Sequence, residues 1–148
     1  VEMKPRGFEQ AHGLHGECVG VGTLMCARAY HELAKRERVE VKPFAPLDRD
    51  WVRAVFGPLA EGIFKENEND VLQTFPPEKI QEHWQEIRDM IAAIPSYEEL
   101  DALYARIGAK HTLAELGIDE GVREDFLNIS SAIRNRLTLA RMTRLIKD

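Results

Sequence analysis

The sequence predicts an all-α fold, a bundle of six or seven helices joined by short turns, and three observations support it. Apolar residues recur at helical spacing, most clearly along one stripe that steps by four, three, four and three residues through Ile80, Trp84, Ile87, Ile91 and Ile94. Capping residues precede such segments, and glycines close them. No segment shows the alternating pattern of a half-buried strand.

The first helix is predicted from His15 to about Lys35. Its apolar residues fall nearly all round the helical wheel, which is typical of a buried central helix. Three glycines lie in its first turns, Gly16, Gly20 and Gly22. Each glycine inside a helix costs about 1 kcal/mol relative to alanine. Their clustering therefore indicates close approach, either of a ligand or of a packed helix.

The second and third helices are defined by aspartates and prolines. Asp48 or Asp50 can cap a helix that runs to Phe64, and Gly57-Pro58 should kink or split it, because proline lacks a backbone donor and crowds the preceding turn. Pro76-Pro77 opens the third helix, which carries the isoleucine stripe described above.

Capping signals define the remaining helices. In chain order these are the capping boxes of Ser96 with Glu99 and of Thr112 with Glu115, the closing glycines Gly108 and Gly117, and the caps Asp119 and Thr138. His83 falls off the stripe of the third helix, so we expect it to face solvent.

Composition limits the classes of function. We expect the 148 residues to form one domain, residues 1–148. A formal charge of −5 argues against a nucleic-acid or membrane-surface partner, which needs a dominant basic face. No apolar run reaches the ~18 residues of a membrane span. Cys18 and Cys26 lie eight apart in one predicted helix, too far for a disulfide, so we expect reduced core thiols and a cytoplasmic setting.

The C-terminal segment departs from the acidic balance of the chain. Between Arg134 and Asp148 it carries five basic residues and one acidic residue. Two interpretations remain open, a solvated basic helix face and a local anion site.

A group of chemically capable residues lies where the N-terminal loop becomes the first helix. His12 and His15 are three residues apart, with Glu17 close behind, and a neutral imidazole at such a place can coordinate a divalent ion. The spacing alone is a weak metal signal. The alternative is that His15 caps the helix and His12 is exposed.

Three motifs in the right order resemble the sn-glycerol-1-phosphate dehydrogenases and their bacterial relatives, in the iron-containing alcohol dehydrogenase and glycerol dehydrogenase-like superfamily. The run 15–24, His-Gly-Glu-Cys-Val-Gly-Val-Gly-Thr-Leu, is similar to the family's His-Gly-Glu-x-x-Gly-x-Gly-Thr segment. Residues 95–100 resemble its Pro-Ser-x-x-Glu-Leu element, and residues 133–138 resemble its Ile-Arg-x-Arg-Tyr-Thr element. The resemblance implies a helix bundle like the C-terminal domain of dehydroquinate synthase-like and iron-containing alcohol dehydrogenases.

The resemblance also implies a metal, a cofactor and a second domain. In the family a divalent metal, zinc, nickel or iron, is held by an aspartate and two histidines, and the last of these ligands corresponds to His15. The other two ligands would lie before Val1, in the protein's own N-terminal nucleotide-binding domain, which binds NAD or NADP. The chain alone is therefore expected to be inactive.

The implied reaction is reduction of dihydroxyacetone phosphate to sn-glycerol 1-phosphate. His12 would contact the metal ligand without binding the metal itself, or it would lie on a proton path. Arg134 and Arg136 would either contact the substrate phosphate or form structural ion pairs. Glu17 receives no catalytic part from its spacing.

Two further functions stay open. One is the same domain of a glycerol dehydrogenase or another alcohol dehydrogenase. The other is a stand-alone, non-catalytic helical interaction module. In either case the protein would have the capacity to form a homo-oligomer.

Overall fold

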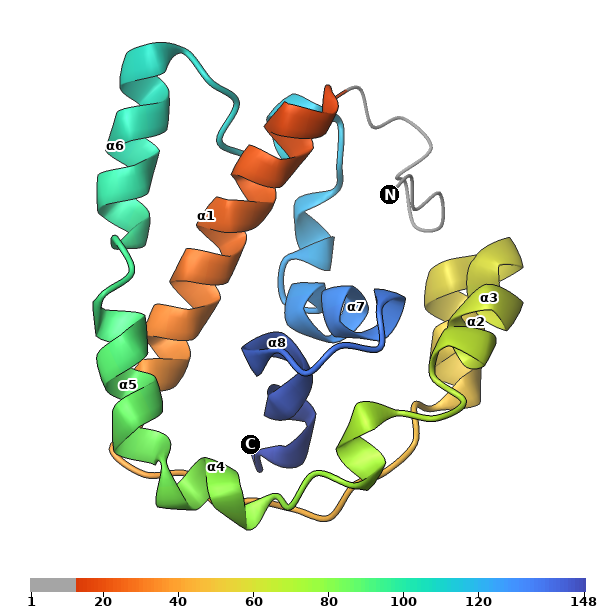
Figure 1. Cartoon of the computed structure of the whole chain (residues 1–148). Helices are drawn as coiled ribbons and strands as arrows, with labels where there is room; N and C mark the ends of the chain where they lie inside the picture. Colours follow the sequence, from red (N-terminus) through yellow and green to blue (C-terminus); the bar gives the residue numbers. More distant parts are fainter. Residues whose placement is uncertain (1–12) are drawn as a thin grey trace. The chain divides into compact units, whose positions relative to one another are not determined.

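The computed structural model describes residues 13–148, which are helical and form two compact units (Figure 1). Within these residues there is no β-strand, only an isolated antiparallel bridge between Val41 and Ile146. The predicted all-α class is confirmed. None of the helices in this part of the chain has the length and apolar character needed to cross a membrane. That residues 1–148 form a single domain stays a prediction.

The first unit comprises residues 13–37 and 85–124. Its helices are α1 (His15–Ala34), α5 (Trp84–Ala92), which belongs to this unit from Gln85 onward, and α6 (Tyr97–Ile107), followed by the short 3-10 helices η4 (Ala114–Leu116) and η5 (Glu120–Val122). Figure 1 shows α1 beside α5 and α6.

Three contacts join the C-terminal half of α1 to α5, to α6 and to the segment between them. The His31 ring lies 3.1 Å from the Ile94 carbonyl, and Arg88 donates to the Ala34 carbonyl at 3.0 Å. The Arg28 guanidinium stacks over the Tyr97 ring at 5.5 Å. These contacts hold α1 against both neighbouring helices.

The core of the first unit joins α1 to the 3-10 segment that follows α6. Val21 packs there with Leu113, Leu116 and Val122, and Met25 and Ile118 cover the cluster. Each of the four central side chains is buried. The short helices η4 and η5 therefore owe their position to hydrophobic burial against α1.

The prediction that α1 is buried all round is wrong. One side of the helix is buried, through Val21, Leu24 and Ala27, whereas Val19 is 53% exposed. Cys18 is exposed, so the prediction that it is a core thiol is wrong. Cys26 is only half-buried. Packing against α5 and α6 covers only part of the circumference of α1. The apolar composition of the helix does not show which part is covered.

The second unit comprises residues 38–84 and 125–148. Its α-helices are α2 (Arg49–Phe56), α3 (Ala60–Glu66), α4 (Glu78–Glu82), α7 (Phe126–Ile133) and α8 (Leu139–Met142), with the 3-10 helices η2 (Gly57–Leu59), η3 (Val71–Gln73) and η6 (Thr143–Leu145). Phe56, Val52, Leu72, Ala132 and Leu145 are fully buried.

The predicted break at Gly57-Pro58 is confirmed. Asp48 caps α2 by accepting from the Asp50 and Trp51 amides at 2.8 Å, and α2 ends at Phe56. Gly57 then adopts a φ of 49°, a conformation that side-chain-bearing residues rarely take. Gly57-Pro58 begins η2, after which α3 restarts the helical course.

The predicted continuous helix through the isoleucine stripe is wrong in one respect. It is broken at His83, whose ψ of 18° separates α4 from α5. Ile80 and Trp84 are buried in the second unit and Ile91 in the first, so the stripe serves two cores on either side of the break. His83 is exposed, as predicted.

The predicted caps are confirmed. Ser96 and Glu99 form a reciprocal capping box at the start of α6, and Gly108 closes that helix with a φ of 66°. Thr112 and Glu115 form the same reciprocal pair, although only the short η4 follows, and Gly117 closes it with a φ of 71°. Asp119 caps η5, and Thr138 caps α8. The single helix expected after Asp119, through Val122 to Ile133, is instead divided into η5 and α7.

Candidate functional site

His15 is the first residue of α1, and it is exposed. Leu14, which precedes the helix, has no side-chain oxygen to accept from the first helical amides. The Leu14 amide itself donates to Glu17 Oε2 at 2.8 Å. The Cys18 amide donates to the Leu14 carbonyl at 3.0 Å. These two bonds fix the backbone of the first turn of α1, from which the His15 side chain extends.

Glu17 ties the same turn to the segment after α6. Its carboxylate lies 3.1 Å from Lys110 Nζ. The hydrogen bond from the Leu14 amide, with that from Lys110, holds the pKa of Glu17 below its usual value. Glu17 is therefore an anion engaged in structure, which agrees with its having no assigned catalytic part.

The loop before His15 is packed closely at Gly13. A Cβ at this position would lie 2.7 Å from Leu116 Cδ2 and 2.8 Å from Cys18 Sγ. A side chain at this position would require the Leu116 and Cys18 side chains to shift. Gly13 thus allows the chain to pass over the core of the first unit immediately before His15.

The three glycines of α1 differ in their surroundings. A Cβ on Gly20 would lie 3.0 Å from Tyr104 Cε2, so Gly20 allows close packing of α6 on α1. Gly16 and Gly22 have no atom within 4 Å of such a Cβ. Helix packing thus explains Gly20, and open space surrounds the position next to His15.

This difference predicts opposite effects of two substitutions. Gly16→Ala should raise the free energy of unfolding by about 0.5–1 kcal/mol, because alanine is the better helix former and nothing obstructs its methyl group. Gly20→Val should lower the free energy of unfolding by about 1–3 kcal/mol, because it overpacks the Tyr104 contact. Urea denaturation of both variants measures the effects. Equal shifts of the same sign would contradict the packing assigned to Gly20.

The described residues do not form a complete metal site. Among residues 13–148 no three His, Cys, Asp or Glu side chains are grouped so that they could hold an ion. His15 can offer one imidazole ligand, and a catalytic metal ordinarily takes three protein ligands. The donor set thus fits a metal only if the remaining ligands come from outside these residues. His12, which was expected to contact the ligand or to lie on a proton path, is outside the described residues.

Arg134 and Arg136 are both exposed, directly after α7. Within the described part of the chain neither guanidinium forms an ion pair, so the structural pairing considered for them is not found. The Arg134 carbonyl accepts from Arg141 at 3.3 Å. Their contact with a substrate phosphate stays a prediction.

A buried ion cluster in the second unit was not predicted from the sequence. Asp70 accepts from Arg141 Nε at 3.2 Å and from Arg144 at 2.7 Å, and Arg141 is completely buried. Arg141 also donates to the Ser131 carbonyl and to the Asn67 side chain. Part of the basic C-terminal segment therefore builds the core and is neither a solvated face nor an anion site. The signal was available: Arg141 falls between apolar residues of a short capped helix.

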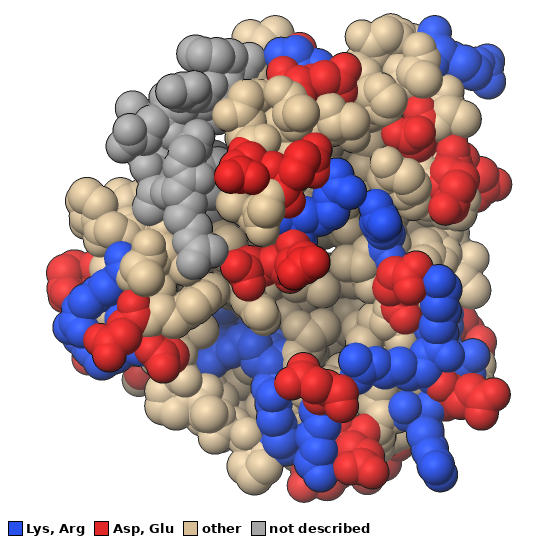
Figure 2. Space-filling model, turned by 180° about the vertical axis from the view of Figure 1, so that it is seen from behind, with Lys and Arg blue, Asp and Glu red and all other residues tan. Residues whose placement is uncertain are grey.

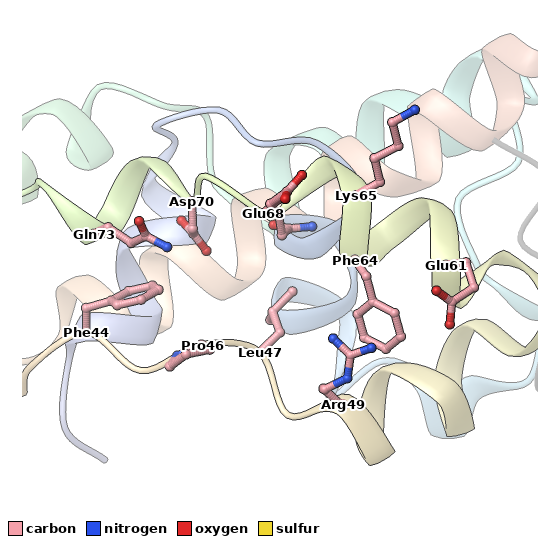
Figure 3. Close-up of a pocket in the computed structure, with 11 residues that line it drawn as sticks. Phe44, Pro46, Leu47, Arg49, Glu61, Phe64, Lys65, Glu68, Asp70 and Gln73 are labelled. Atoms are coloured by element: carbon pink, nitrogen blue, oxygen red, sulfur yellow. The ribbon is translucent and has the colours of Figure 1, made fainter.

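A pocket of about 490 Å³ lies in the second unit between the segment before α2, α3 and the loop after it. Figure 3 shows the Arg49 guanidinium against the Phe64 ring, which lies 3.9 Å from it, and Phe44 near Gln73. Asp70 lines the pocket, but the Arg144, Arg141 and Leu72 donors already occupy its carboxylate. No buried side-chain polar atom in residues 13–148 lacks a partner, so no such group is directed at a ligand.

A second polar cluster lies in the first unit at the end of α6. His111 Nδ1 is 2.6 Å from Asp101 Oδ1, and Nε2 is 3.9 Å from Glu115. The hydrogen bond with Asp101 raises the pKa of His111 above its usual value, and the negative charges of Asp101 and Glu115 add to it. Glu115 also accepts from the Thr112 hydroxyl and amide. The cluster therefore fastens the capped turn before η4 to α6.

Charges of both signs are interspersed on the surface. On the face drawn in Figure 2, basic side chains alternate with acidic ones. Ion pairs such as Lys79 with Glu82 and Lys147 with Glu40 join exposed side chains. The face in view has no dominant basic area of the kind that phosphate binding requires.

Comparisons with protein-family models, with curated proteins and with solved structures found no match.

Proposed function

We propose that this chain is the helical, metal-binding domain of an NAD(P)-dependent dehydrogenase that reduces dihydroxyacetone phosphate to sn-glycerol 1-phosphate. The proposal rests on the resemblance of residues 15–24 to the family's metal-ligand segment. It is supported by one observation above all: His15 is exposed at the first residue of a 20-residue helix, beside the open space at Gly16. A metal ligand needs both a rigid support and an accessible ring.

In this proposal His15 supplies one ligand of a divalent metal, zinc, nickel or iron. Such a metal, when bound, would act as a Lewis acid on the substrate carbonyl. The chain's own contribution is to hold the backbone that carries His15, through the bond from the Leu14 amide to Glu17 and the close packing at Gly13. NAD or NADP would bind mainly to a nucleotide-binding domain outside the described residues.

The substrate's phosphate requires a cation. Arg134 and Arg136 are exposed and form no ion pair within residues 13–148, so both guanidinium groups are available to a bound anion. A glycerol or alcohol dehydrogenase would not need them.

The free thiols of Cys18 and Cys26 favour the cytoplasm as the compartment in which the enzyme acts, because disulfides form mainly in oxidising compartments.

The test measures metal content and dihydroxyacetone-phosphate reduction by the longest natural reading frame that contains this chain. We expect a stoichiometric divalent metal in that protein, lost together with activity in His15→Ala, because removing a ligand from a three-ligand site leaves too few donors. His83→Ala is the matched control, since His83 is also exposed but lies in the second unit, and it should keep metal and activity.

Unchanged metal content in His15→Ala would contradict the assignment of His15. A parent protein without metal would remove the dehydrogenase proposal altogether. Substrate preference then decides between the related functions: a metal-bearing parent that prefers glycerol or another alcohol to the phosphorylated triose belongs to the alternative within the superfamily.

A further inference from the structure

The outer face of α6 carries two large apolar side chains among charged ones. Large exposed hydrophobic side chains in the described residues gather in the first unit, where Leu103 is 45% exposed and Ile107 is 68% exposed. Ala102 is exposed beside them. Surface patches of this kind mark interaction sites more often than isolated apolar residues do.

Helical spacing places five exposed residues on one stripe, which we call the α6 stripe: Glu99, Ala102, Leu103, Arg106 and Ile107. They follow one another at intervals of three, one, three and one, the pattern of a helix face that packs on another helix. The inward face is a different set, since Tyr104 contacts α1 at Gly20. The α6 stripe is therefore unused within the first unit.

Two charged residues of opposite sign flank the centre of the α6 stripe, and the apolar Ile107 follows the second of them. Glu99 lies in the first turn, and its hydrogen bonds with Ser96 keep its pKa below the usual value, so it is an anion. Arg106 lies in the last turn and forms no ion pair with any residue of the described part of the chain. An acidic residue, the pair Ala102 and Leu103, and a basic residue therefore follow one another along one face, with Ile107 at its C-terminal end.

We propose that the α6 stripe binds the α6 stripe of a second copy of this chain, with the two helices antiparallel. Pairing about a two-fold axis between residues 102 and 103 sets Glu99 opposite the second copy's Arg106, and Arg106 opposite its Glu99. Ala102 and Leu103 then meet Leu103 and Ala102 in the middle. A two-fold contact of this kind is self-complementary and closes with two subunits.

The charge pattern selects this orientation. A parallel pairing would set Glu99 against Glu99 and Arg106 against Arg106, which like-charge repulsion disfavours. A single helix face is small beside a standard interface of about 800 Å² per partner, so we expect weak, micromolar association. The inference does not depend on the metal or on the dehydrogenase proposal.

The experiment follows the mass of the chain by sedimentation equilibrium over a concentration series. We expect the unmodified chain to reach the mass of a dimer. Arg106→Glu makes both charged positions of the stripe acidic, and Glu99→Lys makes both basic, so each variant alone should self-associate at least about tenfold more weakly. Mixed in equal amounts, the two variants should form a heterodimer, because every pair is again of opposite charge.

Two controls check that the variants fold and that the contact lies on the α6 stripe. The Ser96 hydroxyl still accepts from the amide of residue 99 in Glu99→Lys, and circular dichroism verifies that helix content is retained. Leu103→Glu, which buries a charge at the centre, should be monomeric, whereas Leu137→Glu, on an exposed leucine of the second unit, should dimerise normally. A monomeric unmodified chain, a mixture that stays monomeric, or a dimer unaffected by Leu103→Glu would each overturn the proposal.

Discussion

Arg141→Met is expected to lower the free energy of unfolding by about 3–5 kcal/mol, the cost of removing one partner from a buried ion pair. Arg141 is completely buried, and its guanidinium binds Asp70, the Ser131 carbonyl and the Asn67 side chain. Methionine fills a similar volume but satisfies none of these acceptors, and Asp70 retains only the Arg144 cation. Chemical denaturation measures the loss.

The matched control is Arg136→Met. Arg136 lies five residues away in the same basic segment but is exposed, so its replacement should change the free energy of unfolding by less than about 0.5 kcal/mol. Similar losses in the two variants would show that net charge, and not the buried cluster, carries the effect.

The same cluster sets the acid sensitivity of the second unit. Burial by itself raises the pKa of Asp70, but hydrogen bonds from the Leu72 amide and Arg144, with the charges of Arg144 and Arg141, lower that pKa below its usual value. The stabilisation is thus present above the unfolded pKa of about 4 and is lost as the pH falls through the lower folded pKa. In Arg141→Met the pKa depression shrinks, so stability should depend less steeply on pH in the acid range.

Leu116→Ala is expected to lower the free energy of unfolding by about 2–5 kcal/mol, the usual cost of truncating a buried leucine. Leu116 is 1% exposed in the core that joins α1 to η4, and its side chain also lies against Gly13. The cavity would therefore open beneath the loop that leads to His15. Thermal denaturation gives the stability change.

Leu137→Ala serves as the comparison, because Leu137 is exposed and its truncation should change the free energy of unfolding by less than about 0.5 kcal/mol. If the parent protein binds a metal through His15 as proposed, Leu116→Ala should also weaken metal binding while His15 itself is unchanged. A stable Leu116→Ala variant would mean that η4 does not pack on α1 as described.

Local signals in the sequence predicted the ends of the helices well. Asp48, Ser96, Thr112 and Thr138 cap the turns that follow them, because each side-chain oxygen satisfies an amide within the next three residues. Gly108 closes its helix with a positive φ for an equally local reason. Such features need no tertiary contact, so a pattern of neighbouring residues suffices to predict them.

The candidate site could be predicted only in part. The motif that begins at His15 correctly indicated a helix start with an accessible ring, and the spacing left Glu17 without a catalytic part, consistent with its bonds to Leu14 and Lys110. The role of Gly20 against Tyr104 and the lack of ion pairs at Arg134 and Arg136 required three-dimensional neighbours.

The sequence by itself determined the all-α class, the caps and closing glycines, the break at Gly57-Pro58 and the first residue of α1. Only the tertiary structure decided which side of α1 is buried and where the isoleucine stripe divides between two cores. It alone also decided that Arg141 pairs with Asp70, which lies 71 residues earlier in the chain. The physical reason is range: capping and turn energies act between residues a few positions apart, whereas burial and ion pairing depend on segments that folding alone brings together.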